Sequence, residues 1–156
     1  MINRIRKNYD RTIPTHDYLK YWRVVRYWSQ AKYKVSSPDI DMMLFLYSEQ
    51  LFTQAKFKEY EEIMSWDKPR FFRLKTEGWI IVWRKKTKDQ VALYELSYKG
   101  KRMINTIYKK LNGEEIGEDK QINPLFRHDA GYADKVYRNM IVKMNKFIRA
   151  EKLKGQ

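Results

Sequence analysis

The chain has 156 residues, which is enough for one domain with a hydrophobic core, so we expect a single domain. It contains no cysteine, which excludes disulfides, thiolate nucleophiles and cysteine-ligated zinc or iron–sulfur sites. The formal net charge is +14, so a polyanion is the first kind of partner to consider.

Apolar stretches are short throughout the chain. The longest, such as residues 42–47, fall far short of the ~20 residues that a membrane-spanning helix needs. The basic start of the chain lacks the apolar region of a signal peptide. We therefore expect no membrane contact, and a cytoplasmic protein of a prokaryotic or virus-infected cell or a component of a virus particle made there.

The positive charge is concentrated in three parts of the chain. Residues 1–34 carry 9 basic and 2 acidic groups, residues 65–102 carry 11 and 4, and residues 130–156 carry 7 and 2. Residues 35–64 instead carry 2 basic and 6 acidic groups. Uniform solubility does not require such segregation, so the distribution favours a polyanion-binding surface over a merely well-solvated one.

The chain begins with residues 1–14, which contain four basic side chains and little periodic hydrophobicity. They are predicted to form an extended basic arm or a frayed terminus. A helix is predicted over residues 15–34, because Thr15 can cap it and apolar residues recur at three- and four-residue steps. This helix has a broad aromatic face, which is expected to form core or a dimer interface.

Two further helices are predicted before the most basic region. Ser36, followed by a serine, a proline and an aspartate, is a strong start for a helix that ends near residue 50. Thr53 can cap the next helix, which extends to about residue 64.

The basic stretch predicts a helix, a hairpin and another helix. The first helix covers residues 66–77 and ends at Gly78. Residues 79–84 and 91–96 are rich in β-branched and aromatic side chains, so they predict an antiparallel hairpin with a loop of about four to six residues. Its tip, residues 84–90, is a basic wing, and Ser97 caps the helix that follows to residue 112. The predicted nucleic-acid contacts are Lys68, Arg70, Arg73, Lys75, Arg84, Lys85, Lys86 and Lys88.

Residues 114–124 have the polar and Gly/Pro content of a loop. A final helix is predicted over residues 130–152, with a short tail at 153–156. Its apolar seam needs a partner surface, so helices 15–34 and 130–152 are predicted to form a dimer or partner interface. The predicted interface residues are Trp22, Val25, Trp28, Val136, Met140, Met144, Phe147 and Ile148.

The order of these elements and three local phrases resemble the MarR family of winged helix-turn-helix regulators. Residues 35–46, VSSPDIDMMLFL, are similar to the opening of that family's second helix. Residues 74–80, LKTEGWI, are similar to the end of its recognition helix, and residues 96–101, LSYKGK, to its strand-to-helix junction after the wing. The resemblance, over roughly residues 15–150, implies a mainly α fold with a β-hairpin wing (α+β) in one domain, residues 15–152, whose winged-helix core is residues 35–112.

The resemblance also implies a homodimeric transcriptional regulator that binds duplex DNA. In that family the fourth helix enters the major groove, the wing reaches an adjacent minor groove, and the first and last helices build a two-fold dimer. Arginine and lysine neutralise phosphates, and arginine can read guanine with two donors. The short 66–77 helix, which contains Pro69, also fits a non-enzymatic structural or interaction protein, for example a virus-particle component that uses the same fold.

The sequence holds no recognisable catalytic constellation. His16 and His128 are the only histidines and lie far apart, and there is no HExxH motif or glycine-rich phosphate-binding motif. The acidic residues between 114 and 119 lack the spacing of a calcium loop. We expect no enzymatic activity, no metal and no cofactor. A ligand pocket around Trp22 and Trp28, which the resemblance suggests, is the alternative to their filling the core.

Overall fold

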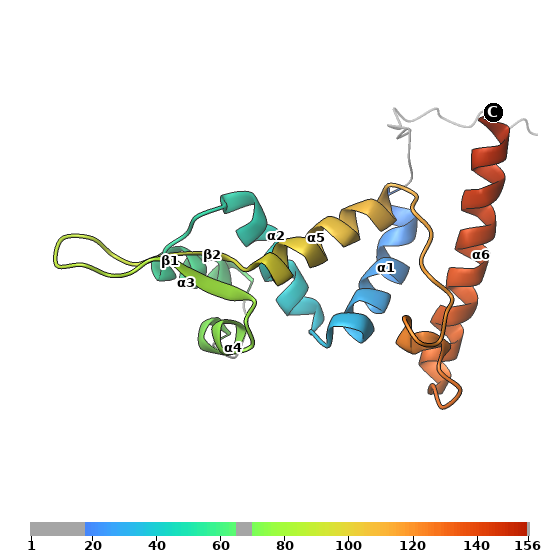
Figure 1. Cartoon of the computed structure of the whole chain (residues 1–156), viewed down its shortest axis with the longest axis horizontal. Coiled ribbons are helices and arrows are strands. Elements are labelled where there is room, and N and C mark those ends of the chain that lie inside the picture. Colours follow the sequence, from blue (N-terminus) through green and yellow to red (C-terminus); the bar gives the residue numbers. More distant parts are fainter. Residues whose placement is uncertain (1–17, 65–69, 156) are drawn as a thin grey trace, which may run out of the picture.

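The computed structural model of the chain describes residues 18–64 and 70–155, which form a mainly helical molecule with one two-stranded antiparallel sheet. Figure 1 shows the hairpin and the last helix at opposite ends of the long axis, so the predicted wing lies far from the predicted C-terminal partner helix. The elements in chain order are α1 (Tyr18–Tyr33), α2 (Ser37–Glu49), α3 (Gln54–Ile63), α4 (Phe71–Thr76), β1 (Ile80–Arg84), β2 (Leu93–Leu96), α5 (Tyr98–Leu111), the 3₁₀ helix η1 (Pro124–Phe126) and α6 (Tyr132–Lys154).

Side-chain caps fix the starts of three helices. The Ser36 hydroxyl accepts the Asp39 N–H at 3.3 Å, and the Asp39 carboxylate accepts the Ser36 N–H at 3.1 Å, which completes a capping box. Thr53 and Ser97 accept backbone N–H groups in the first turns of α3 and α5 in the same way. The starts predicted for α2, α3 and α5 are therefore confirmed, whereas Thr15 and the predicted arm lie outside the described residues.

The predicted antiparallel hairpin is confirmed, with one irregularity. Val82 pairs with Tyr94 and Arg84 pairs with Leu93, so Trp83 is an extra residue in β1 and forms a bulge. The connection covers residues 85–92 and is longer than the four to six residues expected. A bulge bends its strand and increases its twist, so Trp83 sets the direction in which the long loop leaves the sheet.

A backbone bridge ties the hairpin to the connection between α2 and α3. The Phe52 N–H donates to the Tyr94 carbonyl at 3.0 Å, and the Tyr94 N–H donates to the Phe52 carbonyl at 2.8 Å. The sequence predicted no extended residue here, because one isolated bridge has no periodicity to detect. The bridge holds β2 of the hairpin against the connection between α2 and α3.

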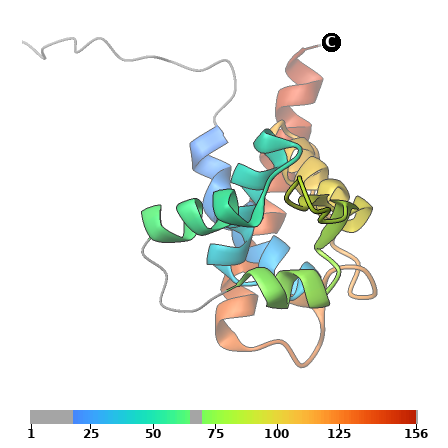
Figure 2. The ribbon, with the colours of Figure 1, turned by 90° about the vertical axis from the view of Figure 1, so that its left-hand side faces the viewer.

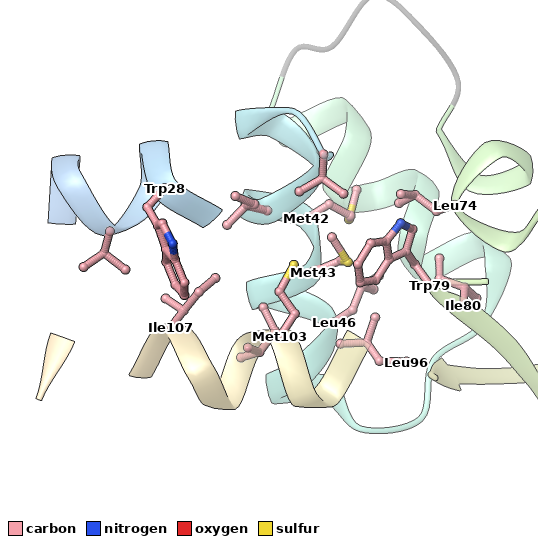
Figure 3. Packing of buried hydrophobic residues seen from close by; sticks show 14 of the residues in the cluster. Trp28, Met42, Met43, Leu46, Leu74, Trp79, Ile80, Leu96, Met103 and Ile107 are labelled. Atoms are coloured by element: carbon pink, nitrogen blue, oxygen red, sulfur yellow. The ribbon is translucent and has the colours of Figure 1, made fainter. Parts of the chain in front are cut away.

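The hydrophobic core runs from α1 through α2 and α5 to the base of the hairpin. Figure 3 shows Trp28 and Ile107 at one end of this cluster and Trp79 and Leu96 at the other, with methionines of α2 and α5 between them. Each of these side chains is almost completely buried. Full burial of one such side chain stabilises the fold by about 1.5–3 kcal/mol.

Four of the eight predicted interface residues belong to this intramolecular core. Val25 is 0% exposed and Trp28 is 3% exposed, and Met144 and Ile148 are also buried. The expectation that they face a second chain is corrected, because α1 packs against both α5 and α6 and uses its apolar face within one chain. The burial of Trp28 equally favours core filling over a ligand pocket. Of the other four, Val136 and Phe147 are exposed and Trp22 and Met140 are half-buried.

One buried asparagine orders the loop between α5 and α6. Asn145 of α6 donates from Nδ2 to the Ile116 carbonyl at 2.7 Å and accepts the Ile116 N–H at 3.1 Å. Both residues are 1% exposed. The segment predicted as a polar loop therefore contributes Ile116 to the core, and Asn145 satisfies the backbone groups that burial would leave without water.

We expect Asn145→Ala to lower the free energy of unfolding by about 2–4 kcal/mol, because it leaves a buried N–H and a buried carbonyl without partners. Urea unfolding measures the loss. Asn105→Ala is the matched control, since Asn105 makes a single side-chain bond, to Tyr47, at the surface, and it should change stability by no more than about 0.5 kcal/mol. Equal losses in the two variants would contradict the assigned role.

Candidate nucleic-acid interface

The tip of the hairpin presents three lysines beside a single carboxylate, Asp89. Lys85, Lys86 and Lys88 are exposed, and among the described residues none of them forms an ion pair. A turn fixes this part of the loop: the Thr87 N–H donates to the Gln90 carbonyl at 2.9 Å, and the Gln90 N–H donates to the Thr87 hydroxyl at 3.1 Å. The structure thus brings these three predicted contacts together at one point.

Arg84 does not belong to this exposed group. Its Nη2 donates to the Val91 carbonyl at 3.1 Å across the hairpin, and the side chain is half-buried. Within the chain, this guanidinium forms a bond that closes the base of the loop. Nothing in the sequence signals this contact, because a side chain that reaches a backbone carbonyl across a hairpin leaves no pattern.

Helix α4 is short, and one face of it is buried. Within the described residues the helix begins at Phe71 and ends at Thr76, beside the expected stop at Gly78, whose φ is +84°. Positions 66–69 of the predicted helix lie outside the described residues. Phe71 and Leu74 point into the core, where the Phe71 ring meets the rings of Phe57 and Tyr94 edge-on. Lys68 lies outside the described residues.

A buried carboxylate connects the start of α2 to α4. Asp39 is 1% exposed, and its Oδ1 lies 3.2 Å from Nη1 of Arg70 and 2.5 Å from Nη2 of Arg73. Arg73 also pairs with Glu77 one turn further along α4 at 3.3 Å. Two of the predicted nucleic-acid contacts therefore have their charge compensated within the chain, and we call this set, Asp39 with Arg70 and Arg73, the Asp39 clamp.

The clamp controls the ionisation of its carboxylate. Burial alone disfavours the charged form of Asp39, but hydrogen bonds from Arg73 and Ser36 outweigh burial and hold its pKa below the ordinary range. The same contact raises the pKa of Arg73, so the pair is fully ionised at neutral pH. A charged pair hydrogen-bonded in this way fixes the direction of α4 relative to α2.

The exposed face of α4 combines apolar and basic side chains. Phe72 is 66% exposed, and Lys75 and Thr76 are exposed beside it. The Lys75 ammonium lies 5.6 Å from the centroid of the Tyr94 ring, which places it over β2 of the hairpin. Figure 2, which views the molecule from the hairpin end, shows α3, α4 and the hairpin together at this end.

Apolar side chains on the hairpin extend this surface. Trp83 is 54% exposed, Val91 is 60% exposed, and Ile81 is 41% exposed. The sequence predicted the strands correctly but did not reveal which side chains would remain in contact with water. Strand alternation does not identify the exposed side chains, because Val82 is also 39% exposed and the bulge at Trp83 interrupts the alternation.

Within the described residues, no group of three His, Asp or Glu side chains could hold a metal ion, and no helix is both long and apolar enough to cross a membrane. No protein-family model matches the chain, and no curated protein or solved structure is significantly similar to it. The candidate site consists of Lys75 on α4 and of Lys85, Lys86 and Lys88 at the tip of the hairpin. The Asp39 clamp holds α4 in place.

We expect Asp39→Asn to lower the free energy of unfolding by about 2–4 kcal/mol at pH 6, because two partly buried guanidinium groups lose their anion. The folded-state pKa of Asp39 lies below its unfolded value of about 3.9, so its contribution is complete above that value and is lost as the pH falls. The difference in the free energy of unfolding between wild type and variant should therefore become smaller from pH 6 to pH 2. Urea unfolding at each pH measures this difference.

Asp41, two positions along α2, provides the control. Burial raises the pKa of Asp41, and nearby Arg26 only partly opposes this shift. Asp41→Asn should therefore cause no comparable loss at pH 6, and its difference from wild type should not narrow in the same direction. A pH-independent gap for Asp39→Asn would show that the clamp does not depend on the charge of its carboxylate.

Proposed function

We propose that this protein is a winged-helix DNA-binding protein, acting as a dimeric MarR-like transcriptional regulator. It contacts duplex DNA through the outer face of α4 and through the wing, residues 84–90. The observation that carries the proposal is the group of three exposed lysines at the wing tip, which form no ion pair within the described residues and lie at the same end of the molecule as α4, the helix that carries Lys75. Lysines in this state attract phosphate and release counterions on binding.

The arrangement of elements supports the proposal. Four helices, α1 to α4, precede a two-stranded hairpin, and α5 follows it directly. Phe52 pairs with Tyr94 and so adds an extended residue beside β2. This pairing fixes the hairpin to the helices, as a wing that contacts DNA requires. A wing anchored at its base and charged at its tip can reach a phosphate backbone while α4 lies against the adjacent groove.

The basic residues divide into two roles in this proposal. Arg70 and Arg73 hold α4 in place through the Asp39 clamp, while the lysines contact phosphates. Phosphate contacts position a protein on DNA without reading its sequence. Phe72, Lys75 and Thr76 are the side chains on α4 that can meet base edges.

The DNA proposal predicts a specific loss when the wing is reversed in charge. Replacing Lys85, Lys86 and Lys88 together by Glu should weaken binding to a 20-base-pair duplex at ~50 mM salt by roughly 100-fold, because three phosphate contacts become repulsions. The slope of log affinity against log salt should become shallower by about 3. Fluorescence anisotropy measures both quantities.

A triple variant with the same net charge separates the wing from general basicity. Lys120, Lys135 and Lys152 are exposed and lie on the 112–131 loop and on α6. Replacing these three lysines by Glu should weaken duplex binding by less than about tenfold, compared with roughly 100-fold for the wing variant. Equal losses, or no binding of the folded wild type, would refute the proposed interface.

We also propose that the dimer uses the exposed side chains of α6, with Phe147 at its centre. Phe147 is 47% exposed beside a groove of about 390 Å³ between α1 and α6. Phe147→Glu should convert a dimer to the 19.2 kDa monomer in sedimentation experiments. Phe45→Glu on α2 is the matched control, since Phe45 is equally exposed. A wild-type monomer at all concentrations would exclude this dimer.

A second candidate function is favoured by the exposed apolar side chains of the hairpin. Trp83, Val91 and Phe72 fit a protein partner better than a phosphate backbone, since such patches mark interaction surfaces. The protein would then be a structural or interaction component of an assembly such as a virus particle. This candidate replaces the first if the folded protein does not bind duplex and copurifies with assembled particles at a fixed stoichiometry.

A further inference from the structure

A second basic surface lies between the end of α1 and the first half of α5. It is a cleft of about 450 Å³, a volume within the range of small-molecule sites. The side chains that line it are cations, tyrosines and a threonine: Lys32, Tyr33, Tyr98, Lys99, Arg102 and Thr106. None of the lining residues belongs to the wing or to α4.

The cations of this cleft lack an internal counterion. The lining contains no carboxylate, and none of the ion pairs among the described residues involves Lys32, Lys99 or Arg102. Burial lowers the pKa of Lys32, and the positive charges of Lys110 and Arg102 lower it further. An anion in the cleft would relieve this repulsion, whereas the protein itself provides none.

Aromatic rings, rather than acids, hold two of the cations in place. The Lys99 ammonium lies 3.9 Å from the centroid of the Trp79 ring and donates to the Glu77 carbonyl at 3.3 Å. The Lys32 ammonium lies 5.0 Å from the Trp28 ring centroid. Cation–π contacts fix an ammonium group without neutralising it, so the cleft stays both ordered and positive.

The cleft also offers an aromatic face to a ligand. Tyr98 is 79% exposed at the first position of α5, directly before Lys99. Tyr33 is half-buried and packs edge-on against Trp79 and Trp28, which holds its ring at the cleft wall. An exposed ring beside phosphate-binding cations is the combination that proteins use to bind the base and the phosphate of one nucleotide.

We propose that this cleft binds a nucleotide, with its phosphate between Lys32, Lys99 and Arg102 and its base stacked on Tyr98. The nucleotide is either free or one unit of a single strand, since both present the same phosphate and base. The site is separate from the wing, and the proposal does not depend on duplex binding.

The test compares adenosine monophosphate, inorganic phosphate and a single-stranded deoxyadenosine 10-mer at ~50 mM salt. Calorimetry follows the small probes, and anisotropy of a labelled strand follows the 10-mer. We expect Arg102→Glu to weaken binding of every bound probe at least tenfold. Tyr98→Ala should weaken the nucleotide probes by about tenfold or more, because it removes a base–aromatic stack, and should leave phosphate unaffected.

Two control variants and one reserve cleft variant complete the test. Lys58→Glu makes the same charge change on α3 and should alter affinity by less than twofold. Lys32→Gln serves as a second cleft variant if Arg102→Glu unfolds. The wing variant with Lys85, Lys86 and Lys88 replaced by Glu should still bind adenosine monophosphate, so failure of the duplex proposal leaves this one standing.

Binding of the 10-mer alone assigns the cleft to single strands, and binding of adenosine monophosphate as well assigns it to free nucleotides; both support the proposal. Failure of the wild-type protein to bind any probe overturns it. Equal losses for Arg102→Glu and Lys58→Glu, or an unchanged nucleotide affinity in Tyr98→Ala, also overturn it.

Discussion

The orientation of the basic end of the molecule depends on one buried carboxylate. Asp39 closes the capping box of α2 with Ser36 and at the same time accepts hydrogen bonds from Arg70 and Arg73. The residue that starts one helix therefore also positions the next basic helix. Because a buried carboxylate is stable only when its hydrogen bonds are made, the relative placement of α2 and α4 is tightly constrained.

This constraint separates the structural charges from the exposed ones. Arg70, Arg73 and Arg84 are committed to a carboxylate or a backbone carbonyl inside the fold, a role that suits the several donors of guanidinium. The wing lysines and Lys75 are instead exposed, and a compact ammonium group at the surface can meet phosphate at little cost. The basic residues of this one stretch therefore differ in their surroundings: these arginines form bonds within the fold, and these lysines are exposed.

Local signals in the sequence predicted most of the helices and both strands. They could not predict contacts between residues that lie far apart in the sequence. Ser36, Ser97 and Gly78 act on neighbours within a few residues, so the helix ends could be located. The Asp39 clamp joins residues 31 and 34 positions apart with no shared motif. The apolar stripe of α1 likewise showed that Val25 would be buried, but not whether its partner would be the same chain or another.

An NMR titration of the ¹⁵N-labelled protein with a 20-base-pair duplex tests the proposed DNA interface most directly. Duplex binding through α4 and the wing predicts chemical-shift changes concentrated at residues 72–76 and 85–90, and these changes should diminish as salt is raised. Shifts confined to α6 or to the α1–α5 cleft, or no shifts from a folded protein at ~50 mM salt, would contradict it.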